Sequence, residues 1–192
     1  STLEAWGVGW DGRRYTIPAT ACGKMHDLRR YELGKGSRAT TGMVASLSGP
    51  VGLDWGQSDT VWLCEGEWDG MALWEAMHSK GSTDIVVSAP GAGIFPEHAL
   101  QNFSGKRVRV LLDNDTAGRN GSRRTGRKLR GVAREVLYLN WPTGDLPEGY
   151  DVRDLYKETK RDPELFLKKL TALLNPSCPG GPLDPEQLGI IS

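Results

Sequence analysis

Several features that mark particular protein classes are scarce or missing in this sequence of 192 residues. No run of about 18 apolar residues occurs, so no membrane-spanning helix is expected. The opening residues STLEAW lack the basic-then-apolar pattern of a secretory signal. The three cysteines are widely spaced and odd in number, which argues against a disulfide framework. These absences predict a protein of a reducing compartment, the cytoplasm, with no membrane contact.

Net charge and an initiator methionine are also missing. The 24 Lys and Arg residues balance the 24 Asp and Glu residues, so charge can attract a polyanion only where it is locally concentrated. The chain begins at Ser1, which indicates a trimmed or excised fragment.

Cys22 and His26 have the spacing of half a zinc site, but no second Cys/His pair completes it, and an ordinary loop is favoured.

Three differently patterned regions follow one another along the chain. Residues 1–56 contain short apolar runs separated by Gly, Ser and Pro, which predicts a small β-rich lobe. Residues 57–175 alternate apolar runs of strand length with stretches of helical periodicity, which predicts an α/β domain with a parallel sheet flanked by helices. Residues 176–192 are rich in Pro and Gly and predict a tail or a linker, and a linker would imply a further domain downstream.

The apolar runs and the turn residues between them give the bounds of the expected elements. Strands of the lobe are expected at 14–18, 28–33 and 43–47. Strands of the parallel sheet are expected at 60–64, 84–88, 107–112 and 135–140. Helices are expected at 68–80, at 96–103, from the third of these strands to about 134, and at 163–175.

Acidic residues gather after three of the predicted strands. The sequences EGEWD (65–69) and DND (113–115) come directly after a strand, and DVRD (151–154) follows the fourth strand after a loop. Because ligands of open α/β sheets bind beyond the carboxyl ends of the strands, these acids are expected to converge at one edge. So many negative charges repel one another unless hard cations neutralise them. The pattern predicts a magnesium enzyme that acts on phosphates.

Each acidic motif also has a simpler interpretation. Acidic residues near helix N-termini are common caps, so the 65–69 motif alone is equally compatible with helix capping and with a metal site. A DxD pair also occurs in glycosyltransferases, phosphatases and ordinary loops, but neither enzyme class accounts for Glu65 or for the basic residues between 119 and 134. The combination of the motifs, in this order, favours a shared metal site.

A cationic stretch follows the DND motif. Arg and Lys occupy seven positions between 119 and 134 without an acid, and five of them recur every three or four residues. On a helix these five would form one basic stripe, whose like charges oppose helix formation by roughly a few tenths of a kcal/mol per pair. Gly121, Gly126 and Gly131 weaken the helix further, each by about 1 kcal/mol relative to Ala. The stretch therefore favours contact with a polyanion over helical stability.

A glycine-containing segment follows the second predicted strand at the same edge. The sequence SAPGAG (88–93) could bring backbone amides close to a phosphate or a base, but a plain strand-to-helix turn is equally compatible. The histidines are scattered at His26, His78 and His98, so no Ser/His/Asp constellation is apparent.

These residues, in this order, resemble the TOPRIM domain that bacterial-type primases, topoisomerases and some nucleases share. EGEWD (65–69) matches the family's Glu motif, and Asp113 and Asp115 match its DxD motif. The continuation DNDTAGR (113–119) is similar to the primase branch, whereas type II topoisomerases typically carry a third acid where this chain has Ala117.

The resemblance extends over about residues 59–156. DVRD (151–154) resembles the distal acidic motif of primases, and residues 88–91 are similar to the primase loop after the second strand. Residues 1–56 are more loosely similar to the basic lobe that precedes TOPRIM in primases and phage primase-helicases.

The resemblance implies a Rossmann-like TOPRIM sheet preceded by a small β-rich lobe, and a DNA primase-type nucleotidyltransferase. Such an enzyme makes short RNA primers on a single-stranded DNA template in a bacterial or phage-infected cell. Its expected partners are the template, ribonucleoside triphosphates and a fused or associated helicase. Two alternatives stay open, a TOPRIM metal-dependent nuclease and a non-catalytic TOPRIM module that binds nucleic acid.

The resemblance also implies roles for particular side chains. Glu65, Asp113 and Asp115 are expected to be catalytic and to hold Mg²⁺, for which Mn²⁺ can substitute, with Asp151, Asp69 and Asp154 assisting. The residues expected to contact nucleic acid or nucleotide are Arg29, Arg30, Lys35, Gly91, Arg119, Arg123 and Arg127.

Overall fold

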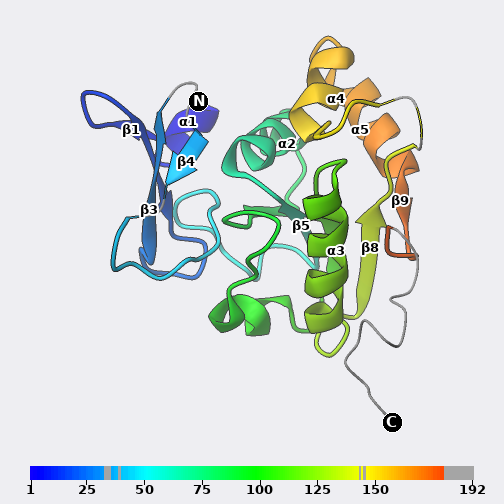
Figure 1. Ribbon diagram of the computed structural model, residues 1–192, viewed down its shortest axis with the longest axis horizontal. Helices are drawn as coiled ribbons and strands as arrows, with labels where there is room; N and C mark the ends of the chain where they lie inside the picture. The colour runs from blue at the N-terminus through cyan, green and yellow to red at the C-terminus, as the bar shows by residue number, and fades with distance from the viewer. Residues whose placement is uncertain (33–35, 39, 143, 145, 180–192) are drawn as a thin grey trace.

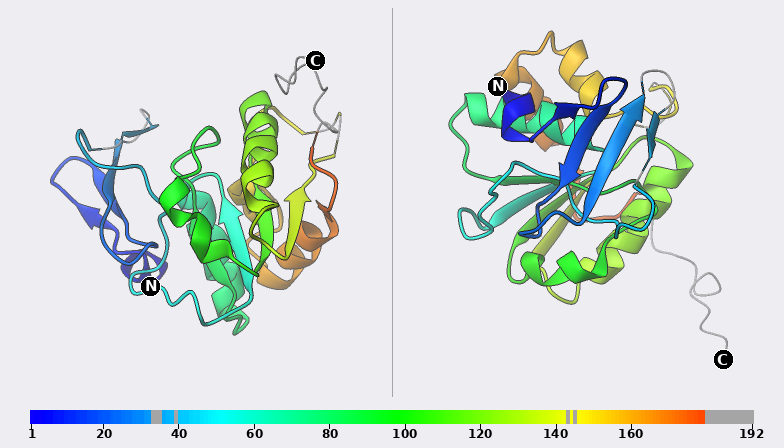
Figure 2. Two further views of the ribbon diagram at one scale, coloured as in Figure 1. Left: turned by 90° about the horizontal axis from the view of Figure 1, so that it is seen from below. Right: turned by 90° about the vertical axis from the view of Figure 1, so that its left-hand side faces the viewer.

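Two β-sheets, one antiparallel and one mostly parallel, organise the molecule (Figure 1). The computed structural model describes residues 1–179 apart from positions 33–35, 39, 143 and 145. The antiparallel sheet lies at one end, beside the carboxyl edge of the parallel sheet, and the described chain ends at the opposite side (Figures 1 and 2). No described helix is both long and apolar enough to cross a membrane.

The antiparallel sheet is built from the N-terminal segment. After a short helix, α1, its strands run in chain order and pair as neighbours. The bounds are α1 Thr2–Ala5, β1 Gly9–Trp10, β2 Tyr15–Ala19, β3 Asp27–Glu32 and β4 Gly36–Arg38. The strands predicted at 14–18 and 28–33 correspond to β2 and β3, whereas α1, β1 and β4 were not predicted.

The strand predicted at 43–47 is wrong. This segment makes single backbone hydrogen bonds, from the Ala21 amide to the Leu47 carbonyl (3.1 Å) and from the Val44 amide to the His26 carbonyl (3.2 Å). Ser48 then forms an isolated bridge with Ser88 of the parallel sheet. The segment passes from one sheet to the other, so it can enter neither ladder.

The second sheet has four parallel strands and one antiparallel edge strand. Its order is β6-β5-β7-β8-β9, and only β9 runs against its neighbour. The bounds are β5 Thr60–Cys64, β6 Ile85–Ser88, β7 Arg107–Leu111, β8 Glu135–Leu139 and β9 Leu174–Asn175. Apolar residues dominate β5 and β6, as expected for strands covered on both faces.

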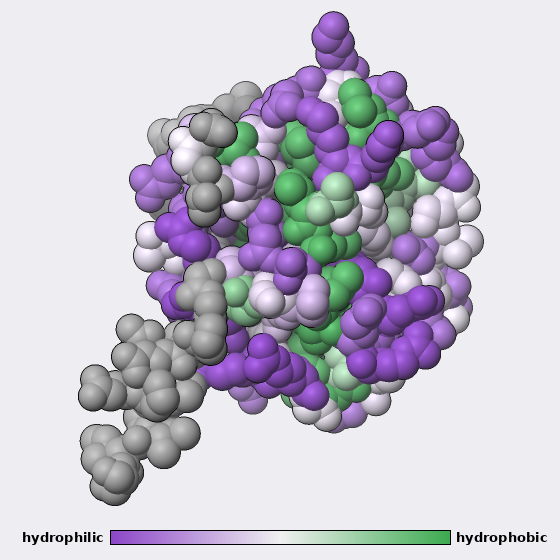
Figure 3. Space-filling view, turned by 90° about the vertical axis from the view of Figure 1, so that its right-hand side faces the viewer, coloured by the Kyte–Doolittle hydropathy of each residue, from purple (hydrophilic) through white to green (hydrophobic). Residues whose placement is uncertain are grey.

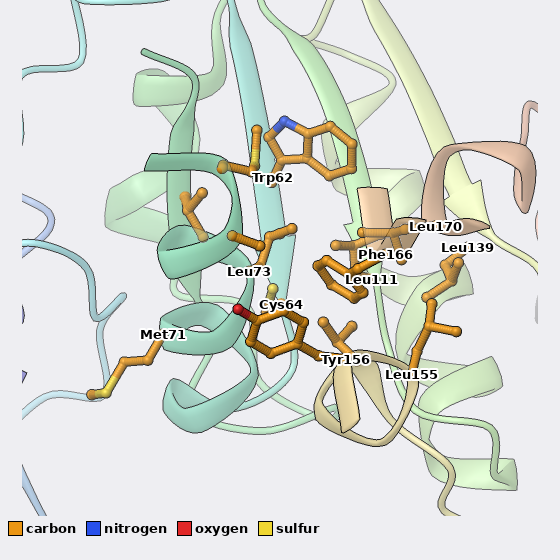
Figure 4. Close-up of a cluster of buried hydrophobic side chains, with 14 of the residues drawn as sticks. Trp62, Cys64, Met71, Leu73, Leu111, Leu139, Leu155, Tyr156, Phe166 and Leu170 are labelled. Atoms are coloured by element: carbon orange, nitrogen blue, oxygen red, sulfur yellow. The ribbon is translucent and has the colours of Figure 1, made fainter. Parts of the chain in front are cut away.

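Helices cover both faces of this sheet, as predicted (Figures 1 and 2). The bounds are α2 Glu67–Ser79, a 3₁₀-helix η1 Glu97–Phe103, α3 Thr116–Leu129, α4 Val152–Glu158 and α5 Pro163–Ala172. Alternate residues of β5 enter opposite cores: Trp62 and Cys64 pack with α2, α4 and α5, and Val61 and Leu63 pack on the η1 and α3 face. Figure 4 shows the first of these cores, with Leu73 and Phe166 reaching it from the helices.

Helix bounds differ from the sequence prediction in three places. The helix α3 ends at Leu129, so Arg134 lies beyond it and does not extend its basic face. The closing helix ends at Ala172, because Leu174 and Asn175 pair with β8 instead. The helix α4 was not predicted, since its seven residues are too short for a clear apolar period.

On the side of the β8–β9 edge, a strip of apolar residues runs between hydrophilic ones (Figure 3).

The glycines of α3 have a packing role that the sequence interpretation missed. Gly118, Gly121 and Gly126 are buried on the face of α3 that meets the sheet. A Cβ at these positions would lie 2.2 Å from the Asp113 carbonyl oxygen, 2.3 Å from the Ala92 carbonyl oxygen and 2.1 Å from the Tyr138 hydroxyl. These glycines allow the helix to approach the sheet closely, so they do not by themselves indicate contact with a polyanion.

Candidate active site

A cavity of about 650 Å³ lies between the two sheets, beyond the carboxyl ends of β5 and β7. Its wall combines carboxylates, two arginines and aromatic rings from segments far apart in the sequence. The lining residues used below are Tyr15, Arg29, Tyr31, Glu65, Glu67, Trp68, Asp69, Gly91, Asp113 and Arg153.

Glu65 links three strand ends at this cavity. It follows β5 directly, and its Oε2 accepts a hydrogen bond from the Asp113 amide after β7 at 3.0 Å. The Ala92 amide, in the loop after β6, also donates to this carboxylate. Burial is the main cause that raises the pKa of Glu65, and the charges of Asp115 and Asp151 add to it against the lowering effect of the two amides. The Glu65 carboxylate is therefore fixed in place and close to other negative charge.

Asp113 lies in the cavity wall close to other acids. Burial, followed by the charges of Glu65, Asp69 and Asp151, raises its pKa to about 8. Asp115 stands two residues further on as the N-cap of α3, where its Oδ1 accepts the Gly118 amide at 2.6 Å. The two acids of the DxD motif thus lie at the same rim, one in the cavity wall and one capping the adjacent helix.

A second acidic pair is joined by an arginine. The side chain of Arg153 places Nε 3.0 Å from Asp69 Oδ1, and its Nη2 pairs with Asp151. Burial and the charge of Asp151 raise the pKa of Asp69 to about 7, while Arg153 lowers it. Burial opposes the charged form of Arg153, but Asp69 and Asp151 together raise its pKa. Asp151 also caps α4 by accepting the Asp154 amide at 2.8 Å.

The sequence interpretation did not identify Arg153 as a site residue. The available signal was its position between the two acids of DVRD, where a cation can neutralise neighbouring carboxylates. Asp154, by contrast, pairs with Lys157 at 2.9 Å and is not among the residues that line the cavity. The structure therefore brings Asp151 to Asp69 but turns Asp154 toward the exposed surface of α4.

Glu67 connects the antiparallel sheet to the site and was also missed as a functional residue. It is almost completely buried, and its carboxylate accepts the Tyr31 hydroxyl and pairs with Arg29 Nε at 3.3 Å. Arg29 Nη2 reaches the Pro90 carbonyl at 3.3 Å. Arg29, predicted to contact nucleic acid, thus lies in the cavity wall within a buried network that joins the lobes.

The other residues predicted to contact nucleic acid or nucleotide lie at different places in the structure. Gly91 lines it and has a backbone φ of +133°, which favours glycine. Arg119 and Arg127 are exposed on α3, whereas Arg123 is half-buried. Arg30 is half-buried on β3, and Lys35 lies outside the described residues.

One further cation of α3 approaches the loop at the cavity. A Cβ built at Gly93 would lie 3.9 Å from Nη2 of Arg124, an exposed residue that was not among the predicted contacts. Of the Cys22–His26 pair, His26 stacks on His98 with ring centroids 4.6 Å apart.

The donor chemistry of the cavity fits a hard divalent cation. The carboxylates of Glu65 and Asp113 are close together and their pKa values are raised, so a bound cation would relieve an electrostatic cost. Within the described ranges, no three His, Cys, Asp or Glu side chains are arranged as a metal cage. Mg²⁺ usually binds through one or two carboxylates together with water and substrate phosphate, so it does not need such a cage.

Comparison with known proteins places this site in context. Residues 62–155 match the family model described as Toprim-like. The fold is similar to that of the primase domains of bacteriophage T7, solved with a lagging-strand DNA polymerase and bound to an RNA/DNA hybrid and dTTP. That match has a TM-score of 0.62 and 18% identity over 88% of this chain and 85% of the other. No curated protein sequence matches the chain.

Two bacterial primases have a similar fold. The RNA polymerase domain of Mycobacterium tuberculosis primase DnaG matches with a TM-score of 0.59 and 21% identity, over 91% of this chain and 62% of that one. The zinc-binding and RNA polymerase domains of the Aquifex aeolicus primase match with a TM-score of 0.60 and 21% identity, over 90% of this chain and 45% of that one. At these identities the comparisons establish the fold, and this chain spans less than half of the Aquifex protein.

Proposed function

We propose that this chain, which contains a Toprim-like domain and has the fold of primase polymerase domains, is a DNA primase-type nucleotidyltransferase. It would make short RNA primers on single-stranded DNA in a metal-dependent reaction. The observation that carries the proposal is the contact between the Glu65 carboxylate and the Asp113 amide. This contact joins the Glu motif and the DxD motif at one cavity.

Three carboxylates are proposed to hold Mg²⁺, or Mn²⁺ in its place: Glu65, Asp113 and Asp115. When bound, the ion would activate a primer 3′-hydroxyl and neutralise charge on a triphosphate. The amides of Asp113 and Ala92 orient Glu65, and the Gly118 amide orients Asp115. Asp69 and Asp151, already joined by Arg153, would assist by adding negative potential and by fixing α4 against the rim.

The nucleic acid and the nucleotide would be held mainly through phosphate contacts. Exposed cations of α3, Arg119 and Arg127, stand on the helix that Asp115 caps. Gly91 supports the approach of a phosphate or base to the cavity because it has no side chain and a positive φ. We include Arg29, Arg30, Lys35 and Arg123 in this proposed contact set.

The wider organisation of the protein is also a proposal. We propose a β-rich lobe at 1–56, a TOPRIM catalytic domain at 57–175 and a tail or linker at 176–192. A similar solved structure is the primase fragment of the bacteriophage T7 primase-helicase protein, with a TM-score of 0.60 and 18% identity over 87% of this chain and 68% of that one. A fused or associated helicase is therefore the proposed partner.

The test is template-directed synthesis with labelled ribonucleotides, single-stranded DNA and Mg²⁺. A parallel reaction with labelled DNA measures whether the DNA is shortened. New short RNA with the wild type, lost in Asp113→Asn and retained in Glu164→Gln, is the expected result. Glu164 is a matched control because it is exposed and pairs only with Lys80 among its described ion pairs. Shortened DNA without new RNA would indicate the nuclease, and the absence of both products together with no Mg²⁺ binding would indicate the non-catalytic module.

A further inference from the structure

A row of four aromatic rings runs from the edge of the antiparallel sheet to the acidic cavity. We call Trp10, Tyr15, Trp68 and Tyr31 the aromatic row. Successive ring centroids are 5.0 Å apart for Trp10–Tyr15, 5.9 Å for Tyr15–Trp68 and 5.4 Å for Trp68–Tyr31. All three pairs meet edge to face, with interplanar angles of 63°, 88° and 70°. The rings are thus continuous, and in each pair the edge of one ring meets the face of the other, so no two of them are stacked face to face.

The outer end of the row is too exposed to be explained by core packing. Trp10 is 56% exposed, whereas Trp6, only four residues earlier, is fully buried in the core. Tyr15, Trp68 and Tyr31 are half-buried and line the cavity. A large aromatic side chain that remains exposed beside a cavity is typical of a contact surface for a planar ligand.

The inner end of the row lies against the proposed catalytic groups. Trp68 stands between Glu67 and Asp69, and it lines the same cavity as Asp113. The Tyr31 hydroxyl is bonded to Glu67, which holds that ring at the cavity wall. A base stacked on these inner rings would therefore lie beside the carboxylates.

We propose that the aromatic row stacks the bases of single-stranded nucleic acid that enters the cavity. This inference rests on the proposed function and assigns the row to the strand rather than to the free nucleotide. Aromatic side chains bind successive bases without sequence preference, because every base has a π-face. Pro90 and Gly91 line the same cavity, and Arg124 lies near the loop that contains them, so this part of the site could contact the phosphates.

The position of Trp10 distinguishes binding of a strand from binding of a single nucleotide. Trp10 is not among the residues that line the cavity, although it contacts Tyr15, which is. A nucleotide whose phosphates reach Glu65 and Asp113 would be confined to the cavity and would not contact Trp10. A ligand that uses the full row must extend out of the cavity, as a strand of several nucleotides does.

The experiment measures binding of labelled oligodeoxythymidine and of an abasic strand of equal length and charge, by fluorescence anisotropy. Trp10→Ala should weaken binding of the thymidine strand by about tenfold, because base–aromatic stacking has an effect of that size. Binding of the abasic strand should change by less than about twofold, since phosphate contacts are untouched. Trp10→Phe should retain most of the affinity, and Met25→Ala, another exposed apolar residue of the same lobe, should retain all of it.

The inference and the proposed function can fail separately. Equal binding of the thymidine strand by the wild type and Trp10→Ala would overturn the inference, even if primers are made. An equal loss for the thymidine and abasic strands would also overturn it, as would a matching loss of affinity for free ribonucleoside triphosphate. The binding assay contains no ribonucleotides and follows no synthesis, so a stacking effect of Trp10→Ala would stand even if no polymerisation is detected.

Discussion

Two acidic pairs at the cavity are stabilised in different ways. In the amide-held pair, Glu65 and Asp113, the Glu65 carboxylate accepts backbone amides. In the arginine-held pair, Asp69 and Asp151, the cation Arg153 lies between the carboxylates. The comparison teaches that proximity of acids does not identify metal ligands. The pair without an internal cation is the one that needs a cation from outside.

The largest expected effect follows from changing the amide-held pair. Asp113→Asn keeps the shape of the side chain but removes its charge, so template-directed primer synthesis should fall by at least about 100-fold. Initial rates with labelled ribonucleotides measure this, and circular dichroism checks the fold. Normal synthesis by this variant would remove Asp113 from the proposed site.

The next effect follows from removing the cation of the arginine-held pair. Arg153→Met leaves Asp69 and Asp151 buried without their partner, so the free energy of unfolding should fall by about 1–3 kcal/mol. This range is below that of a fully buried pair because the Arg153 side chain is 41% exposed. Urea unfolding measures the change.

A second substitution shows whether this loss has the stated cause. Adding Asp69→Asn to Arg153→Met should recover part of the stability, because the repulsion between the two acids is then gone. An additive loss in the double variant would contradict the pairing.

A smaller effect sharpens the distinction between the two pairs. Mg²⁺ at about ten times its dissociation constant should stabilise the wild type by about 1.4 kcal/mol, since it binds only the folded chain. Asp113→Asn should lose this shift, and Asp154→Asn should keep it, because Asp154 is already paired with Lys157. Thermal unfolding with Mg²⁺ and with a chelator gives the comparison. Loss of the shift in Asp154→Asn would place that residue in the metal site after all.

The smallest effect is expected at an ion pair on the surface of α4. Lys157→Met should change stability by less than about 0.5 kcal/mol, because exposed pairs are screened by solvent. Urea unfolding of Lys157→Met and Arg153→Met, measured side by side, would show whether the more buried cation contributes more to the free energy of unfolding. A similar loss in both variants would mean that the arginine-held pair has no special role.

Sequence patterns could predict the sheet and the region of the site. The runs before Glu65 and Asp113 are apolar enough to be buried strands, and the carboxyl ends of neighbouring parallel strands meet at one edge. The positions of Arg29 and Arg30 as neighbours on β3 could also have predicted that only one of them faces the site. Successive side chains of a strand point to opposite faces, so one arginine turns inward to Glu67.

Other contacts of the site could not be deduced from the sequence. The pairing of Arg153 with Asp69 joins residues 84 positions apart and depends on where the unpredicted helix α4 begins. The close approach of α3 depends on which neighbours its glycines meet, such as Tyr138 at Gly126. Spacing shows that side chains share a face, but it does not show what packs against that face.

The buried links of Glu67 to Tyr31 and Arg29 have a mechanical consequence. Separating the antiparallel sheet from the parallel sheet would break the contacts of Glu67 with Tyr31 and Arg29 together. These contacts favour the spacing of the two sheets that the structure shows around the cavity. In the proposed function, a nucleic-acid strand would therefore enter a cavity whose width is set before it binds.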